Sequence, residues 1–157
     1  MTGIRIAVVA LLGFFAVDCQ SGQPAEGDIV QWQLPDKLRE ISGLALTSDE
    51  RLLAVTDEEG IVYEIDYVHG GLVKAFAIGD PTVRADFEGI AILDDKVWLL
   101  TSNARLYSFP EGMDGERVAY ERVNTGLGDE CEFEGLAAEA RTGMLLLLCK
   151  DSKKKKM

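Results

Sequence analysis

Short apolar or alternating runs recur along most of the chain, and each ends in a turn rich in Asp, Asn or Gly. Their β-branched and aromatic content favours strands, and no window of a dozen residues beyond the N-terminal segment shows helical periodicity. The predicted strands lie at residues 28–34, 52–56, 61–65, 72–78, 97–101, 106–109, 117–123 and 144–149. The pattern predicts an all-β fold.

A six-residue motif precedes each group of strands and repeats at a fixed interval. It consists of an acidic residue, an apolar residue, a polar or acidic residue, glycine, an aliphatic residue and alanine. The copies are residues 40–45 (EISGLA), 86–91 (DFEGIA) and 132–137 (EFEGLA). Their glycines, Gly43, Gly89 and Gly135, are 46 residues apart in both intervals. Four strands in a unit of this length are typical of a β-propeller blade, and a β-sandwich of short strands would not explain two equal intervals.

The units amount to about two and a half four-stranded blades, whereas a β-propeller closes with roughly 4–8. We therefore predict an incomplete β-propeller over residues 28–157, truncated at its C-terminus from a longer product. Completion by association of chains is the alternative. The lysines at 153–156 are interpreted as a solvated turn at a blade edge that is cut before its next strand.

The N-terminal residues form a separate segment. Residues 6–17 (IAVVALLGFFAV) are apolar without interruption but too few to span a bilayer as a helix, which needs about 20. Residues 1–19 are therefore interpreted as an export signal. Cys19 ends a stretch that resembles a bacterial lipoprotein processing site and is predicted to carry a lipid anchor. Plain secretion is the alternative, because Asp18 stands where a small residue is usual, and residues 20–27 (QSGQPAEG) would form a tether.

The other two cysteines, Cys131 and Cys149, would then lie in a compartment that permits disulfides. A hairpin that turns near residues 141–143 would place them on neighbouring strands at similar heights. They either form a bridge or remain two buried thiols that pack as small apolar groups. The sequence leaves both alternatives open.

The formal net charge of −11 disfavours nucleic-acid binding, and no basic stripe with interleaved aromatic residues occurs. An acidic excess is compatible with cation binding or a cationic partner. The second and third motifs each contain two carboxylates at positions that share one face of a strand. These are Asp86 with Glu88 and Glu132 with Glu134.

Carboxylates that converge from several blades repel one another unless a cation neutralises them, and oxygen ligands suit Ca²⁺ or Mg²⁺. We therefore predict a Ca²⁺ site with Glu88 and Glu134 as ligands and with Asp86 and Glu132 in support. Alternatively, these acids hydrogen-bond backbone amides and fix the blade spacing. No catalytic residue is predicted, because nucleophile elbow, phosphate loop and zinc spacing are all missing from the sequence.

Taken together, four segments resemble the SdiA-regulated family of bacterial envelope β-propellers, which have five or six blades. They are residues 38–45, 54–60 (AVTDEEG), 86–91 and 132–137, and the resemblance extends over residues 28–152. It implies an exported envelope protein, lipid-anchored or periplasmic, that recognises another envelope protein or a small ligand. Related propellers have esterase-like or phytase-like names, so a Ca²⁺-dependent hydrolase of phosphate or carboxylic esters is the alternative. Such an enzyme would work with the carboxylates of the repeated motifs alone.

Overall fold

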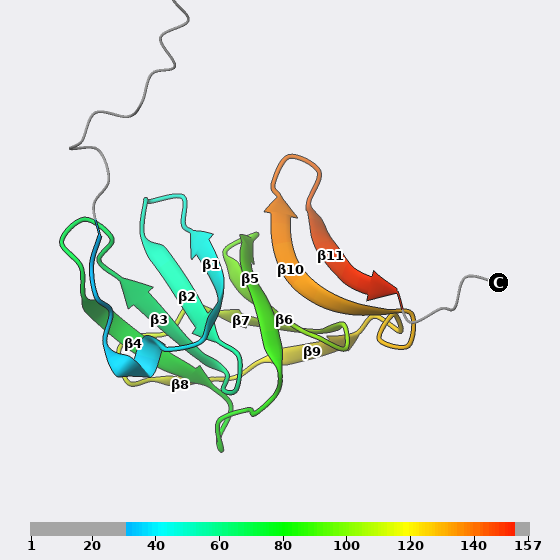
Figure 1. Cartoon of the computed structure of the whole chain (residues 1–157), viewed down its shortest axis with the longest axis horizontal. Coiled ribbons are helices and arrows are strands. Elements are labelled where there is room, and N and C mark those ends of the chain that lie inside the picture. The colour runs from blue at the N-terminus through cyan, green and yellow to red at the C-terminus, as the bar shows by residue number, and fades with distance from the viewer. Residues whose placement is uncertain (1–30, 153–157) are drawn as a thin grey trace, which may run out of the picture. The chain divides into compact units, whose positions relative to one another are not determined.

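The computed structural model describes residues 31–152, which form strands, the connecting turns and loops, and one 3-10 turn, η1 (Asp36–Leu38). The strands form three open sheets that do not close into a barrel or ring within these residues (Figure 1). The predicted export signal, Cys19, the tether and the lysines at 153–156 lie outside the described part. No helix between residues 31 and 152 has the length and apolar character needed to cross a membrane.

Each sheet begins with the strand that contains a motif. The strands that come next in the sequence pair with it one after another in antiparallel order. The first sheet contains β1 (Ile41–Leu46), β2 (Leu52–Thr56), β3 (Ile61–Ile65), β4 (Leu72–Ile78) and β8 (Arg117–Val118). The second contains β5 (Phe87–Leu93), β6 (Lys96–Thr101), β7 (Arg105–Pro110) and β9 (Glu121–Asn124). The third contains β10 (Cys131–Glu139) and β11 (Met144–Ser152). The prediction of an all-β chain is confirmed, and β2, β3 and β4 have the predicted bounds.

Two strand predictions differ from the structure. The strand predicted at 117–123 is two short strands, because β8 leaves the second sheet and pairs in parallel with β4. Val118 of β8 is buried in the core beside Phe76, and this apolar contact accounts for the change of sheet. Of the strand predicted at 28–34, residues 31–34 are described and are not in a strand.

The motif glycines are the points where successive sheets approach most closely. A Cβ at Gly43 would lie 2.9 Å from the backbone nitrogen of Ile90, and a Cβ at Gly89 would lie 2.8 Å from that of Leu136. The inner strands β1, β5 and β10 therefore stack backbone against backbone, and they run side by side in Figure 1. Any side chain at Gly43 or Gly89 would force the sheets apart.

A second repeated contact links the sheets. The Phe87 amide donates to the Asp57 carbonyl at 2.7 Å, and the Phe133 amide donates to the Ser102 carbonyl at 3.0 Å. Both acceptors directly follow the second strand of their unit, and both donors directly follow the acidic residue of the next motif. The repeated residues thus make the same backbone bond at both junctions.

Two apolar clusters fill the space between the sheets. The cluster between the first and second sheets contains Leu53, Val55, Val62, Phe76, Ile78, Phe87, Ile90, Val97, Leu99, Tyr107, Phe109 and Val118. The cluster between the second and third sheets contains Leu100, Ala104, Leu106, Cys131 and Phe133. The first sheet also carries a cluster on its opposite face, where the segment before β1 places Leu38 against Ala54 and Tyr63.

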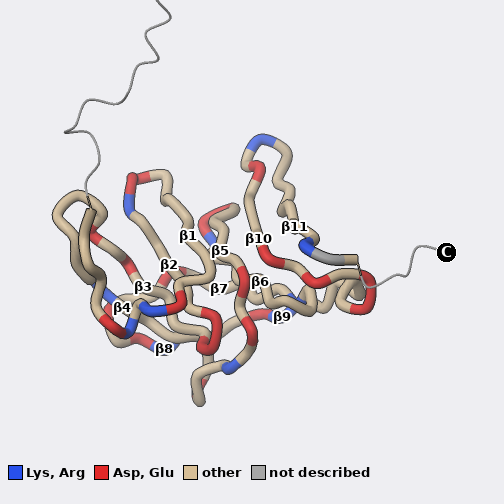
Figure 2. Tube along the Cα trace, viewed as in Figure 1, with Lys and Arg blue, Asp and Glu red and all other residues tan. Residues whose placement is uncertain are grey.

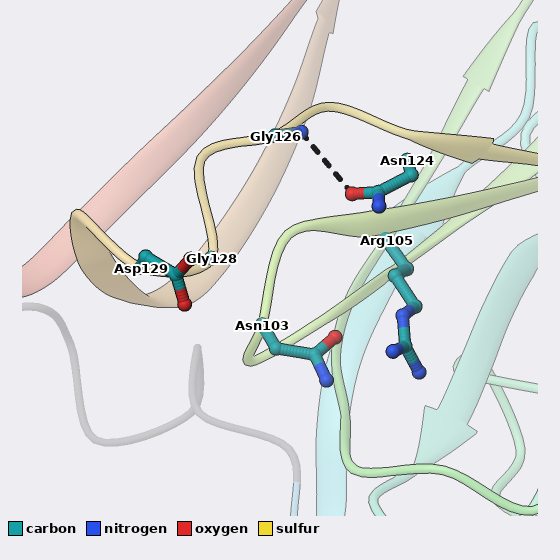
Figure 3. Close-up of a pocket in the computed structure, with 6 residues that line it drawn as sticks. All are labelled: Asn103, Arg105, Asn124, Gly126, Gly128 and Asp129. Carbon is teal, nitrogen blue, oxygen red and sulfur yellow. Dashed lines mark hydrogen bonds between the residues drawn. The ribbon is translucent and has the colours of Figure 1, made fainter.

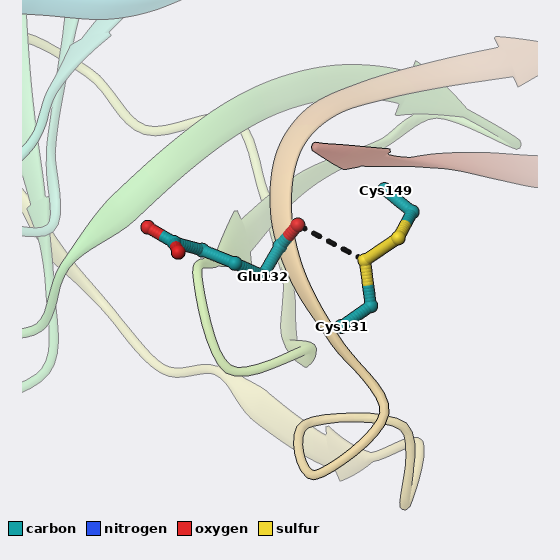
Figure 4. The surroundings of a disulfide bond; sticks show 3 residues. All are labelled: Cys131, Glu132 and Cys149. Carbon is teal, nitrogen blue, oxygen red and sulfur yellow. Dashed lines mark hydrogen bonds between the residues drawn. A yellow bond between two sulfur atoms is a disulfide. The ribbon is translucent and has the colours of Figure 1, made fainter. Parts of the chain in front are cut away.

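A disulfide joins Cys131 of β10 to Cys149 of β11, with 5.8 Å between their Cα atoms (Figure 4). Of the two alternatives that the sequence left open, the structure has the bridge. The Cys131 sulfur lies 3.1 Å from the carbonyl oxygen of Glu132. This is a contact without a shared proton, because a bridged sulfur carries none. The disulfide closes the base of a two-stranded sheet that has few other partners.

Candidate functional site

The stacked inner strands bring carboxylates from neighbouring sheets together. Glu88 and Glu134 each precede a motif glycine, so the stacking of β5 on β10 places them next to each other. Asp86 lies just before β5, and Asp57 follows β2 beside it. Figure 2 shows acidic positions along the first residues of β5 and β10. We call Asp57, Asp86, Glu88, Glu132 and Glu134 the acidic rim.

Glu88 is a rim carboxyl whose pKa is strongly raised. Partial burial of its carboxyl, followed by the negative charges of Asp86, Glu134 and Asp57, raises its pKa from 4.5 to about 7. The protonated Glu88 carboxyl also donates a hydrogen bond to Asp86, which favours the neutral form. One carboxyl of the rim therefore keeps its proton close to neutral pH.

Lys150 of β11 supplies a positive charge to the rim. Its ammonium group donates a hydrogen bond to Glu134, and this bond is the main reason why the pKa of Lys150 is raised. The charges of Glu134, Glu132 and Glu88 raise that pKa further. A cationic group is thus already bound among these carboxylates, but it does not remove the repulsion that holds the proton on Glu88.

The structure brings some of the four predicted calcium ligands close together. Glu88 interacts with Asp86 and Glu134, while Glu132 acts on Lys150. In the part of the chain that is described, no three Asp, Glu, His or Cys side chains gather closely enough to hold a metal ion. The calcium site stays a prediction. In the first motif, Ser42 takes the place of Glu88 and contacts the Val55 carbonyl at 3.4 Å.

A second polar site lies at the turn between β6 and β7 and was not anticipated from the sequence. A cavity of about 290 Å³ is lined by Asn103, Arg105, Asn124, Gly126, Gly128 and Asp129 (Figure 3). The Thr101 hydroxyl donates to the side-chain oxygen of Asn103 at 2.7 Å, and the side-chain oxygen of Asn124 accepts from the Gly126 backbone amide at 3.1 Å. The volume is small for a ligand pocket, and the lining is polar rather than apolar.

A network of ion pairs fixes the outer strands of the first sheet. Arg51 donates to Glu64 at 2.9 Å and to Glu111 at 3.0 Å, and Lys74 lies 3.6 Å from Glu64. The Arg51 hydrogen bond is the main reason why the pKa of Glu111 is lowered. Arg51 also pairs with Asp49 at 2.8 Å, so every carboxylate of this network lies beside a cationic group. This network could not be anticipated from local sequence patterns, because Arg51 and Glu111 are 60 residues apart.

The single histidine, His69, is exposed in the turn between β3 and β4 and hydrogen-bonds Asp66 through its backbone amide at 2.9 Å. This position is away from the acidic rim and from the cavity of Figure 3. Comparison with known proteins finds no family model and no curated protein that matches this chain.

Proposed function

We propose that this chain forms part of a β-propeller in an exported envelope protein and that it is a recognition module without catalytic activity. The support is the repeated unit: three sheets that begin with the same motif, the 46-residue spacing and the same backbone bond at both junctions. Resemblance to the SdiA-regulated family agrees with this architecture. The lipid anchor at Cys19 and the envelope location depend on the N-terminal sequence alone.

The recognition surface in this proposal is the acidic rim, and its ligand carries a positive charge. The observation that carries the proposal is the convergence of Asp57, Asp86, Glu88 and Glu134 from three sheets, with Lys150 bound among them. Carboxylates held together by a fold repel one another until a cation arrives, so binding relieves a cost already present in the free protein. Ca²⁺ and a cationic segment of an envelope protein are the two ligand types that this charge favours.

Hydrolysis of phosphate or carboxylic esters is the second candidate. The observation that favours it is the pKa of about 7 at Glu88, since a general acid or base works best near the operating pH. Turnover of a generic phosphoester or carboxylic ester that is lost in Glu88→Gln would replace the first proposal by this one.

The test is a thermal melt of the chain completed to its natural length, titrated with CaCl₂ and, separately, with a trilysine peptide. We expect either probe to raise the melting temperature of the wild type, because a ligand that binds only the folded state stabilises it. The shift should vanish in Glu88→Gln/Glu134→Gln.

The matched control is Asp95→Asn/Glu121→Gln, which removes two exposed carboxylates outside the rim. The control should keep the shift. Equal shifts in wild type and both double variants would show general charge screening and overturn the acidic rim as the binding surface. If the melting temperature does not change in any of the proteins, the rim acids do not bind cations and serve only to set the spacing of the sheets.

A further inference from the structure

The cavity at the turn between β6 and β7 is lined by one charge of each sign. Arg105 is the first residue of β7, and Asp129 lies in the loop between β9 and β10. Within residues 31–152, neither the Arg105 guanidinium nor the Asp129 carboxylate takes part in an ion pair. Figure 3 shows these two side chains on opposite sides of Asn103. A cavity with both charges is complementary to a ligand that also carries both.

The two asparagines of the lining add hydrogen-bond donors to the guanidinium of Arg105. The side-chain oxygen of Asn103 accepts from the Thr101 hydroxyl at 2.7 Å, and that of Asn124 accepts from the Gly126 backbone amide at 3.1 Å. Because the fold already engages both oxygens, the NH2 groups are the part of each amide that a ligand can use. Together with the guanidinium, these NH2 groups form a set of donors that suits a carboxylate.

The loop that carries Asp129 is fixed against the β6–β7 turn. The Thr125 hydroxyl donates to the Ala104 carbonyl at 2.9 Å. A Cβ at Gly128 would lie 2.4 Å from the carbonyl oxygen of Asn103, so glycine is what permits this close approach. The cavity is therefore formed before a ligand arrives, and binding costs less conformational entropy than it would in a mobile loop.

We infer that this cavity binds a small α-amino acid. The carboxylate of the ligand lies against Arg105 and the two asparagine amides, and its ammonium group lies against Asp129. The volume of about 290 Å³ is at the lower end for ligand pockets, which limits the ligand to a small side chain. None of the lining residues belongs to the acidic rim, so this ligand binds independently of a cation at the rim.

The lining disfavours other classes of ligand. Asp129 would repel a simple anion such as phosphate, and Arg105 would repel a metal ion. None of the six lining residues is aromatic, so a nucleobase would have no ring on which to stack. A ligand that carries both charges is the one that satisfies both Arg105 and Asp129.

An NMR titration of the nitrogen-15-labelled chain, expressed from its full coding sequence, tests the inference with three probes. L-alanine carries both charges, propionate lacks the ammonium group, and ethylammonium lacks the carboxylate. We expect L-alanine to shift the side-chain amide signals of Asn103 and Asn124 to saturation and to bind more tightly than either other probe. Arg105→Gln and Asp129→Asn should each weaken L-alanine binding by about tenfold or more, because each removes a charge-assisted hydrogen bond.

The two variants should have opposite effects on the two singly charged probes. Asp129→Asn should bind propionate more tightly than the wild type does, because a repelling charge is gone. For the same reason, Arg105→Gln should bind ethylammonium more tightly. A merely structural role of Arg105 or Asp129 would instead weaken the binding of all three probes.

The matched controls are Arg122→Gln and Asp95→Asn, which each remove one exposed charge outside the cavity. Both should keep the wild-type affinity for L-alanine. Equal affinities for propionate and L-alanine would overturn the inference and indicate a plain anion site. If L-alanine gives no saturable shift at high millimolar concentration, or if the controls lose as much affinity as the variants, the cavity is not an amino-acid site.

Discussion

The junction between the first and second sheets differs from the junction between the second and third, although the same motif builds both. The first has a cluster of twelve buried residues with three aromatic pairs near it, whereas the second has five buried residues. The backbone contacts are equivalent: a glycine against the next inner strand and one amide-to-carbonyl bond. The motif therefore sets the position of a sheet, and the outer strands determine how much apolar surface it buries.

The third sheet shows the consequence of having only two described strands. One face of β10 and β11 packs against the second sheet, and Leu146 and Leu148 are exposed on the opposite face. The disulfide at Cys131 and Cys149 compensates by restricting the hairpin in the unfolded chain. Units built from the same motif are thus stabilised by different means. Apolar packing stabilises the junction between the first and second sheets, and a disulfide stabilises the β10–β11 hairpin.

Truncation of the motif phenylalanines should reveal this difference most strongly. Phe87→Ala should lower the free energy of unfolding by about 3–5 kcal/mol, because Phe87 is fully buried in the larger cluster. Phe133→Ala should cost about 3 kcal/mol or less, since fewer residues surround the cavity. Urea unfolding followed by tryptophan fluorescence measures both. A larger loss for Phe133→Ala would contradict the order of the two junctions.

Removal of the disulfide should have the next largest effect and should be confined to the third sheet. The bridged residues are 18 apart, and a loop of about this size contributes about 3 kcal/mol. In Cys131→Ala/Cys149→Ala, the amides of β10 and β11 should exchange with solvent faster by hydrogen exchange, while those of β2 and β3 keep their protection. Dithiothreitol should reproduce the effect in wild type and do nothing in the variant. Uniform loss of protection over all three sheets would show that they unfold as one unit.

Much of this fold was predictable, because its strands are short, alternate in hydrophobicity and end at Asp, Asn or Gly turns. The repeat also identified Gly43, Gly89 and Gly135, which proved to be where the sheets approach each other. The exchange of β8 into the first sheet was not predictable. It depends on the burial of Val118 against Phe76, and no local pattern records a contact between residues so far apart.

The acidic rim was only partly predictable. Alternation along a strand indicated that Asp86 and Glu88 belong together, and the repeat added Glu132 and Glu134. Lys150 was missed, because its place beside Glu134 depends on the register between β10 and β11. The register includes two irregular steps near Phe133, which a count of alternating residues cannot anticipate.

Alanine at the motif glycines tests whether the two junctions share the same close approach. Gly89→Ala and Gly43→Ala should each cost about 1–3 kcal/mol, because the new Cβ would press on backbone atoms of the next strand at 2.8–2.9 Å. Gly135→Ala meets only the Leu148 side chain at 3.1 Å and should cost less than about 1 kcal/mol. All three are measured by urea unfolding. Equal losses at the three glycines would contradict a close approach limited to the internal junctions.

The smallest expected effect is a pH dependence of the free energy of unfolding, which arises from Glu88 at the second junction. Folding raises the pKa of Glu88 from 4.5 to about 7, so the folded chain binds more protons between these values and its stability falls as pH rises through them. Glu88→Gln should therefore be more stable than wild type above pH 7, by about 1 kcal/mol after allowance for solvent screening, and equal to it below pH 4.5. Glu121→Gln on β9 is the control for the loss of one negative charge. If the advantage of Glu88→Gln does not grow between pH 4.5 and pH 7, then the neighbouring carboxylates do not act on Glu88, and the second junction differs from the first in packing alone.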